Sequence, residues 1–116
     1  MKNLWLWIAA AIVFVGGYFV FFSKPSTVSG ETIKIGVILP LTGSRADGGE
    51  FGKNGLTIAE EEINTDNKKK YKIQFIYEDS KYEAQAAVTS FQKLKDLDGV
   101  KYIVGAYGSS ETLAVA

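Results

Sequence analysis

Apolar positions divide the chain into one long uncharged run and several shorter runs separated by polar turns. Residues 4–22 (LWLWIAAAIVFVGGYFVFF) carry no charge. At about 1.5 Å per helical residue, such a run just covers a bilayer core about 30 Å thick. Its flank, residues 19–24 (FVFFSK), is bulky where a signal peptidase needs small residues. We therefore expect an uncleaved transmembrane signal-anchor, with a cleaved signal peptide as the alternative.

The residues around this segment predict its orientation and the domain boundaries. Residues 1–3 form a short cytoplasmic n-region with Lys2, and Lys24 follows the apolar run. We expect the N-terminus inside and the following domain on the extracytoplasmic side. Residues 23–31 (SKPSTVSGE) are small and polar, which is typical of a tether. Residues 32–116 then form the domain.

Three short apolar runs in the domain are typical of buried strands. Ile33–Leu39 is rich in β-branched residues and ends at Pro40, which cannot donate to a sheet ladder. The glycine-rich residues 42–52 after it are expected to form a loop. Tyr71–Tyr77 and Val100–Val104 are the second and third predicted strands.

Helical periodicity follows each of the first two strands. Leu56, Ala59 and Ile63 form one apolar stripe on a helix expected from residue 50 or 51 to residue 64. Glu83–Leu97 is the clearest helix, and Gly99 lies just past its end.

A third helix is expected at the end of the chain, after a turn rich in glycine and serine. Ser109 or Ser110 is a favourable N-cap for it. The first amides of a helix can also bind carboxylates. These two serines therefore have two interpretations, helix capping or anion binding, which the pattern alone leaves open.

Alternating strands and helices imply a parallel sheet with right-handed crossovers. The fold class we predict is α/β, a partial doubly wound three-layer lobe with strand order 2-1-3, preceded by an N-terminal hydrophobic helix. The chain has 116 residues, so one small domain is expected.

Composition removes several classes of function. The chain has no cysteine and no histidine, which excludes thiol nucleophiles and the usual zinc sites and removes the commonest general base. We expect no metal and no cofactor. The formal net charge is +0, so nothing favours nucleic acid as a partner.

Known catalytic and phosphate-binding motifs fail on inspection. A Walker A loop needs Gly-Lys followed by serine or threonine, but Gly52-Lys53 is followed by Asn54. The Rossmann fingerprint G-x-G-x-x-G is broken at residues 43–45 (GSR). The serine-hydrolase elbow G-x-S-x-G lacks its closing glycine at residues 108–112 (GSSET). We therefore expect a protein that is not an enzyme.

Four stretches taken in order resemble the amino-terminal lobe of the leucine-binding-protein family, the type I periplasmic solute-binding proteins of ABC importers. The stretches are IKIGVILPLTG (33–43), GLTIAEEEIN (55–64), IYEDSKYEAQAAV (76–88) and YIVGAYGSSET (102–112). The resemblance covers about residues 32–116. It implies two α/β lobes that close over a small solute, such as a branched-chain or other amino acid, for uptake by an ABC transporter permease.

The resemblance also implies which residues touch the solute. In that family the serine-rich turn after the third strand holds the ligand carboxylate, which makes Ser109 the first candidate here and Ser110 and Thr112 the next. Gly108 and Tyr107 belong to the same turn, and Tyr107 lines the cleft or packs beneath it.

The loop after the first strand is implied to supply another wall of the site, with Ser44 as its candidate contact. Many family members have a large side chain in this loop, where this chain has Gly48 and Gly49.

Family chains are far longer than this one, so we expect residues 32–116 to be an incomplete N-terminal lobe. The main functional hypothesis is that the chain is a fragment of a solute-binding protein. The alternative is a membrane-tethered interaction or sensor module without independent ligand binding.

Overall fold

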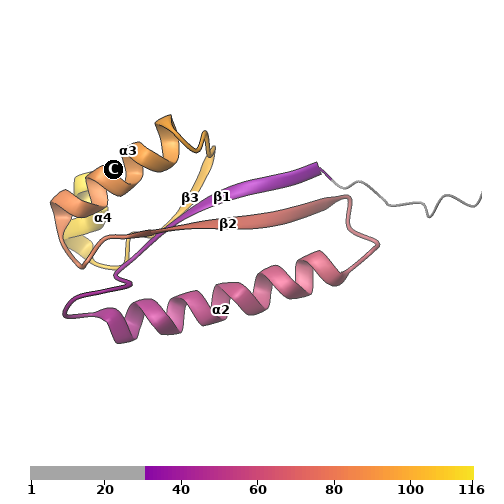
Figure 1. Ribbon diagram of the computed structural model, residues 1–116, viewed down its shortest axis with the longest axis horizontal. Helices are drawn as coiled ribbons and strands as arrows, with labels where there is room; N and C mark the ends of the chain where they lie inside the picture. Colours follow the sequence, from indigo (N-terminus) through magenta and orange to yellow (C-terminus); the bar gives the residue numbers. More distant parts are fainter. Residues whose placement is uncertain (1–30) are drawn as a thin grey trace, which may run out of the picture.

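The computed structural model describes residues 31–116. The elements in chain order are β1 (Glu31–Leu39), α2 (Ala46–Thr65), β2 (Tyr71–Asp79), α3 (Ala84–Asp96), β3 (Tyr102–Val104) and α4 (Ser109–Val115) (Figure 1). The predicted n-region and transmembrane segment, and the tether up to residue 30, lie outside the described residues. No helix within residues 31–116 is long and apolar enough to cross a membrane.

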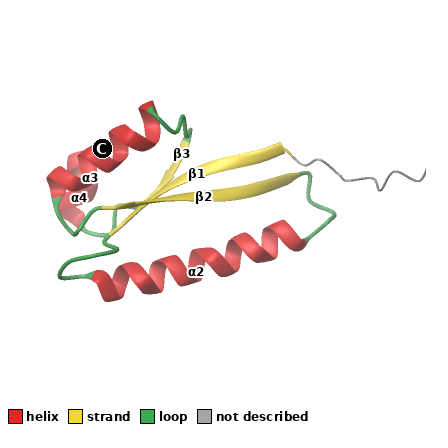
Figure 2. Ribbon diagram, in the orientation of Figure 1, coloured by secondary structure: helices red, strands yellow, loops and turns green. Residues whose placement is uncertain are grey.

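The three strands form one parallel sheet in the order β2-β1-β3, which confirms the predicted α/β topology. β1 is central, and its Ile35 has Phe75 on one side and Tyr102 on the other as register partners. α2 covers one face of the sheet, while α3 and α4 cover the other (Figure 2). The described residues therefore form three layers, and β1 is hydrogen-bonded along both of its edges.

The core lies between the sheet and α3. It contains four buried side chains, contributed by β1, α3 and the approach to β3: Ile38, Ala87, Leu94 and Val100. α3 turns an apolar face toward the sheet, with partly buried Phe91 beside this cluster. Burial of this face, rather than intrinsic helix propensity, supplies most of the stability of such a helix.

The predicted start of α2 is wrong. The helix begins at Ala46 rather than at residue 50 or 51, so most of the expected glycine-rich loop is helical. The glycines of this stretch allow close packing of the helix against β1, and they do not form a turn. A Cβ on Gly49 would collide with the carbonyl oxygen of Pro40, and a Cβ on Gly52 would lie 3.3 Å from Leu39. Glycine at these positions allows the first turns of α2 to lie directly against the end of β1.

The other boundaries differ by smaller amounts. β1 starts two residues before the predicted Ile33, and β2 continues to Asp79, two residues past the predicted end. β3 is shorter than predicted because it starts at Tyr102 rather than Val100. Parallel pairing decides these ends, since β1 and β2 are in register from their first residues to their last.

Substitution of Gly49 by alanine should destabilise the fold, because its neighbour is backbone that cannot move aside. We expect Gly49→Ala to lower the free energy of unfolding by about 1–3 kcal/mol, as in other overpacked sites. Gly55→Ala is the matched control, because a Cβ there meets nothing within 4 Å. That control should raise stability by about 0.5–1 kcal/mol through helix propensity.

Urea unfolding of the full chain, followed by circular dichroism, measures both variants. Equal shifts of the two variants in the same direction would contradict the packing role assigned to Gly49.

Candidate functional site

The carboxyl ends of the three strands meet at one edge of the sheet. From this edge the chain leaves β1 toward α2 on one face and leaves β3 toward α4 on the other face (Figure 1). Ligands of doubly wound proteins bind outside the carboxyl ends of strands, where neighbouring connections diverge in this way. The candidate site therefore lies between residues 40–45 and residues 105–108.

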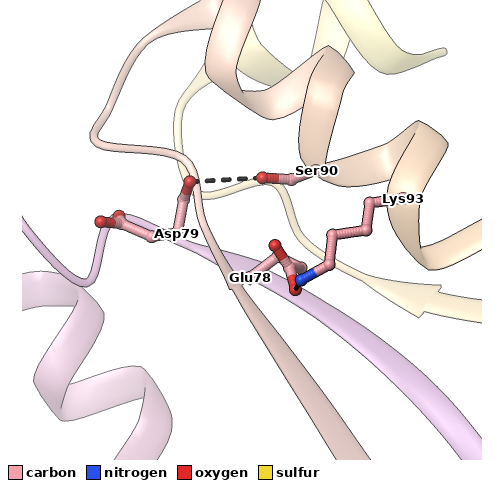
Figure 3. A network of polar contacts seen from close by, with 4 residues as sticks. All are labelled: Glu78, Asp79, Ser90 and Lys93. Carbon is pink, nitrogen blue, oxygen red and sulfur yellow. Dashed lines mark hydrogen bonds and ion pairs between the residues drawn. The ribbon is translucent and has the colours of Figure 1, made fainter. Parts of the chain in front are cut away.

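The loop after β1 is held by the carboxylate of Asp79, the last residue of β2. Its Oδ1 accepts hydrogen bonds from the amides of Leu41 (2.9 Å), Thr42 (3.2 Å) and Lys81 (2.8 Å). Its Oδ2 accepts one from the Thr42 hydroxyl (2.5 Å). In Figure 3 this carboxylate points toward the loop after β1, away from α3. One side chain thus fixes the loops after both β1 and β2.

These hydrogen bonds also set the charge state of Asp79. Partial burial acts to raise the pKa of its carboxyl group. The Thr42 hydroxyl and the amides of Lys81, Thr42 and Leu41 act in the opposite direction, and the pKa lies below its ordinary value of 3.8. Hydrogen bonds to the ionised form favour that form, so Asp79 is a carboxylate at neutral pH.

This role of Asp79 differs from the one that its sequence context indicates. Residues 78–80 look like a turn whose carboxylates cap the next helix, yet Glu83 is the N-cap of α3 and makes no side-chain cap bond. Glu78 instead pairs with Lys93, and the Ser90 hydroxyl donates to the backbone carbonyl of Asp79 at 3.2 Å (Figure 3). The acidic end of β2 is thus tied to α3 as well as to the loop after β1.

The serine turn after β3 is arranged differently from its predicted capping geometry. α4 begins at Ser109, and its N-cap is Gly108, so neither serine hydroxyl caps the helix. The cap bond comes from Glu111, whose Oε2 accepts the Gly108 amide at 2.7 Å. The capping interpretation of Ser109 and Ser110 is therefore wrong, and both side chains are exposed at the edge of the sheet.

The remaining site candidates divide into structural and exposed residues. The Thr112 hydroxyl donates to the carbonyls of Gly108 (2.9 Å) and Ala106 (3.2 Å), so it holds the turn together. Gly108 is buried, whereas Tyr107 is about half exposed beside it. Ser44 is exposed in the loop after β1, the other wall of the candidate site.

Two further residues shape the turn after β3. Gly105 has φ +118°, and a Cβ there would collide with the backbone of Ile38, so only glycine permits this departure from the sheet. The side chain of Glu111 is fully buried, and its Oε1 has no hydrogen-bond partner among the described residues. The role of Gly105 was not visible in the sequence, because it depends on a contact that forms only after the strands assemble. The cap bond of Glu111 is local, and a glutamate three positions after the N-cap is the signal that could have found it.

A hollow of about 580 Å³ lies elsewhere, at the amino ends of the strands, lined in part by Glu31, Lys34, Tyr71 and Lys101. It borders the point where the described residues begin. It is also remote from the divergent loops that define ligand sites in this architecture, and we place the candidate site at the carboxyl edge. Within residues 31–116, no cluster of three or more acidic, histidine or cysteine side chains is placed to hold a metal ion.

The parallel sheet, the loops diverging at its carboxyl edge and the exposed serine turn define one lobe of a ligand-binding α/β protein. Residues 32–116 match the periplasmic binding protein family, and the chain belongs to that family. A search of curated protein sequences found no match.

Solved structures agree with this assignment. An ABC transporter substrate-binding protein from Sphaerobacter thermophilus is 34% identical over 73% of this chain, with a TM-score of 0.66. The substrate-binding protein LivJ from Streptococcus pneumoniae, in complex with isoleucine, is 30% identical over 73% of the chain, with a TM-score of 0.68. A solute-binding protein from Rhodopseudomonas palustris, in complex with 4-hydroxybenzoate, is 28% identical over 73% of the chain, with a TM-score of 0.63.

The matched region is only part of each of these proteins. The chain spans 23%, 25% and 23% of their respective lengths. What it shares with them is the lobe architecture, confirmed by the strand order and the family match.

The hydrogen bonds of Asp79 predict a specific pH dependence of stability. Because its folded pKa lies below the unfolded value of about 3.9, the ionised carboxylate stabilises the fold above that pH. This contribution disappears as the pH falls through the folded pKa. We expect Asp79→Asn to lower the free energy of unfolding at pH 7 by about 1–3 kcal/mol and to flatten its decline between about pH 5 and pH 2.

Glu78→Gln is the matched control, since Glu78 precedes Asp79 and its carboxylate pairs with Lys93 of α3 instead of with the loops. Denaturant titrations of both variants across this pH range measure the effect. The assignment of the two loops to Asp79 is refuted if Glu78→Gln loses as much stability at pH 7 as Asp79→Asn.

Proposed function

We propose that this chain supplies one lobe of an extracytoplasmic solute-binding protein, which captures a small carboxylate-bearing solute for an ABC transporter permease. The role is binding and delivery rather than catalysis, as in the substrate-binding proteins whose fold it shares. Membership of the periplasmic binding protein family supports the extracytoplasmic location.

One observation carries this proposal: the exposed hydroxyls of Ser109 and Ser110 lie at the edge where the connections after β1 and β3 diverge. Hydroxyl groups are good donors to a carboxylate. Because Glu111 contributes the cap bond of α4, these hydroxyls are available to a solute. Ser44, exposed on the opposite loop, is the candidate contact from the other wall.

Amino acids, including branched-chain ones, are one of two classes of carboxylate-bearing solute that we propose. LivJ from Streptococcus pneumoniae, described in complex with isoleucine, supports this class. The Rhodopseudomonas palustris relative is described in complex with 4-hydroxybenzoate. That solute has a carboxylate but no amino group. The carboxylate is the feature that both solutes have in common, and the serine hydroxyls suit it.

Solute binding can be measured with the full chain in detergent micelles by ligand-observed NMR, using isoleucine and 4-hydroxybenzoate as probes. Ser109→Ala should weaken binding of the bound probe by about 10- to 100-fold, the usual range for a hydrogen bond to a charged group. Thr57→Ala is the control, because its hydroxyl bonds only its own helix, to the Lys53 carbonyl, and it should leave binding unchanged.

A folded chain that binds neither probe would count against this function. It would favour the alternative role, a membrane-tethered interaction or sensor module.

We propose further that residues 4–22 anchor the chain in the membrane with the lobe outside. Removal of these residues should release the protein from the membrane fraction, since the segment supplies 19 uncharged residues, enough to span a bilayer. Alkaline extraction followed by immunoblotting measures the difference. Mass spectrometry showing a mature N-terminus between residues 23 and 31 would instead establish a cleaved signal peptide.

A further inference from the structure

Three large side chains from three different loops form a row at the candidate site. The guanidinium carbon of Arg45 lies 5.6 Å from the ring centroid of Tyr82. The Tyr82 and Tyr107 rings are 6.2 Å apart, with an interplanar angle of 67°. These residues follow β1, β2 and β3 respectively, so the row crosses the carboxyl edge of the sheet.

The backbone before and at Tyr82 is held in a conformation that side chains rarely adopt. Lys81 has φ 53° and Tyr82 has φ 62°, two consecutive non-glycine residues in the left-handed region. The carboxylate of Asp79 accepts the Lys81 amide, and the carbonyl of Ser80 accepts the amide of Glu83 at 2.8 Å. Strain of this kind persists where surrounding bonds enforce it, and it concentrates at ligand-binding sites. Here it places the Tyr82 ring between the other two members of the row.

The position of Tyr107 depends on a glycine of the facing helix. A Cβ on Gly48 would collide with the hydroxyl end of the Tyr107 ring. The tyrosine therefore occupies the space that a side chain at position 48 would take. An aromatic ring from the turn after β3 thus replaces a side chain from α2 as part of the wall.

The row remains open on one side. Tyr82 is 36% exposed and Tyr107 is 48% exposed, although each already contacts another member of the row. Tyr107 directly precedes the buried Gly108 and the exposed Ser109. Aromatic surface and hydroxyl donors therefore belong to one turn, a combination that suits a flat ring bearing a carboxylate.

Two acidic side chains at the carboxyl edge of the sheet, Asp79 and Glu111, are not open to an ammonium group. Both oxygens of Asp79 accept hydrogen bonds from the protein, and Glu111 is fully buried. The exposed carboxylates nearest to the row in sequence are Glu83, directly after Tyr82, and Asp47, in the first turn of α2.

We propose that Arg45, Tyr82 and Tyr107 form the specificity wall of this site and select aromatic carboxylates over aliphatic amino acids. The solute ring packs against the two tyrosines, with the edge of the solute ring toward the face of a tyrosine ring. The solute carboxylate accepts hydrogen bonds from Ser109 and Ser110. This inference rests on the proposed solute-binding function and narrows its solute class. Edge-to-face and offset contacts between rings add affinity beyond the apolar area that they bury.

The test compares benzoate with cyclohexanecarboxylate, which has the same carboxylate and nearly the same size but no aromatic ring. Titrations use the full chain in detergent micelles, with ligand-observed NMR as the readout and isoleucine as a third probe. We expect benzoate to bind about threefold to tenfold more tightly than cyclohexanecarboxylate, the range measured for aromatic pairs. Benzoate should also bind more tightly than isoleucine.

Variants assign the preference to the wall. Tyr107→Leu should remove the advantage of benzoate over cyclohexanecarboxylate, whereas Tyr107→Phe keeps the ring and should retain it. Tyr71→Leu is the control, because Tyr71 is similarly exposed but lies at the amino end of β2. A circular dichroism spectrum of each variant verifies that it is folded.

The outcomes separate this inference from the function on which it rests. Equal binding of benzoate and cyclohexanecarboxylate, or tighter binding of isoleucine, overturns the aromatic preference and leaves solute binding standing. Absence of binding by all three probes overturns both. Loss of the preference in Tyr71→Leu as well as in Tyr107→Leu overturns the assignment to the wall.

Discussion

The carboxylate of Asp79 is the constraint on which the edge of this lobe depends. It joins the loop after β1 to the loop after β2 through four hydrogen bonds, three of them from backbone amides. Its donors Leu41 and Thr42 are separated from it by 38 and 37 positions in the chain, so the contact requires β1 and β2 to be paired first. The shape of the edge is therefore a consequence of the sheet, fixed by a residue that belongs to neither loop.

Both walls of the candidate site inherit their geometry from this sheet. β1 ends at Leu39, and the amides of Leu41 and Thr42, directly after Pro40, donate to the Asp79 carboxylate. On the other side, Gly105 allows the chain to leave β3 against the backbone of Ile38. The exposed serines and tyrosines thus belong to loops whose backbone is held in place by the strands. Sites supported in this way keep their donors oriented before a ligand arrives, which reduces the entropy lost on binding.

The fold was predictable because apolar periodicity follows local geometry. The runs at 33–39 and 71–77 and the helical stripe of residues 83–97 each correspond to an element of the structure. The start of α2 was not predictable, because its glycines resemble loop signals until the contact with Pro40 is known. The role of Asp79 was missed for the same reason, since its partners in a neighbouring loop leave no local pattern. The cap bond of Glu111 is local, to Gly108 three positions earlier, and was missed because glycine rather than serine or threonine holds the N-cap position. The serine turn was located correctly, but its capping interpretation failed because glycine holds the N-cap position.

The close approach of Tyr107 to Gly48 has a consequence for how such lobes can diverge. The two positions share one volume, although they lie on different elements and are far apart in the sequence. A bulky residue at either position requires a small one at the other. A single bulky substitution at position 48 overpacks this volume, and a single small substitution at position 107 leaves it unfilled. The wall can be built from a side chain at position 48 of α2 or from one at position 107 of the turn after β3. Stepwise mutation from one form to the other therefore passes through a less stable intermediate.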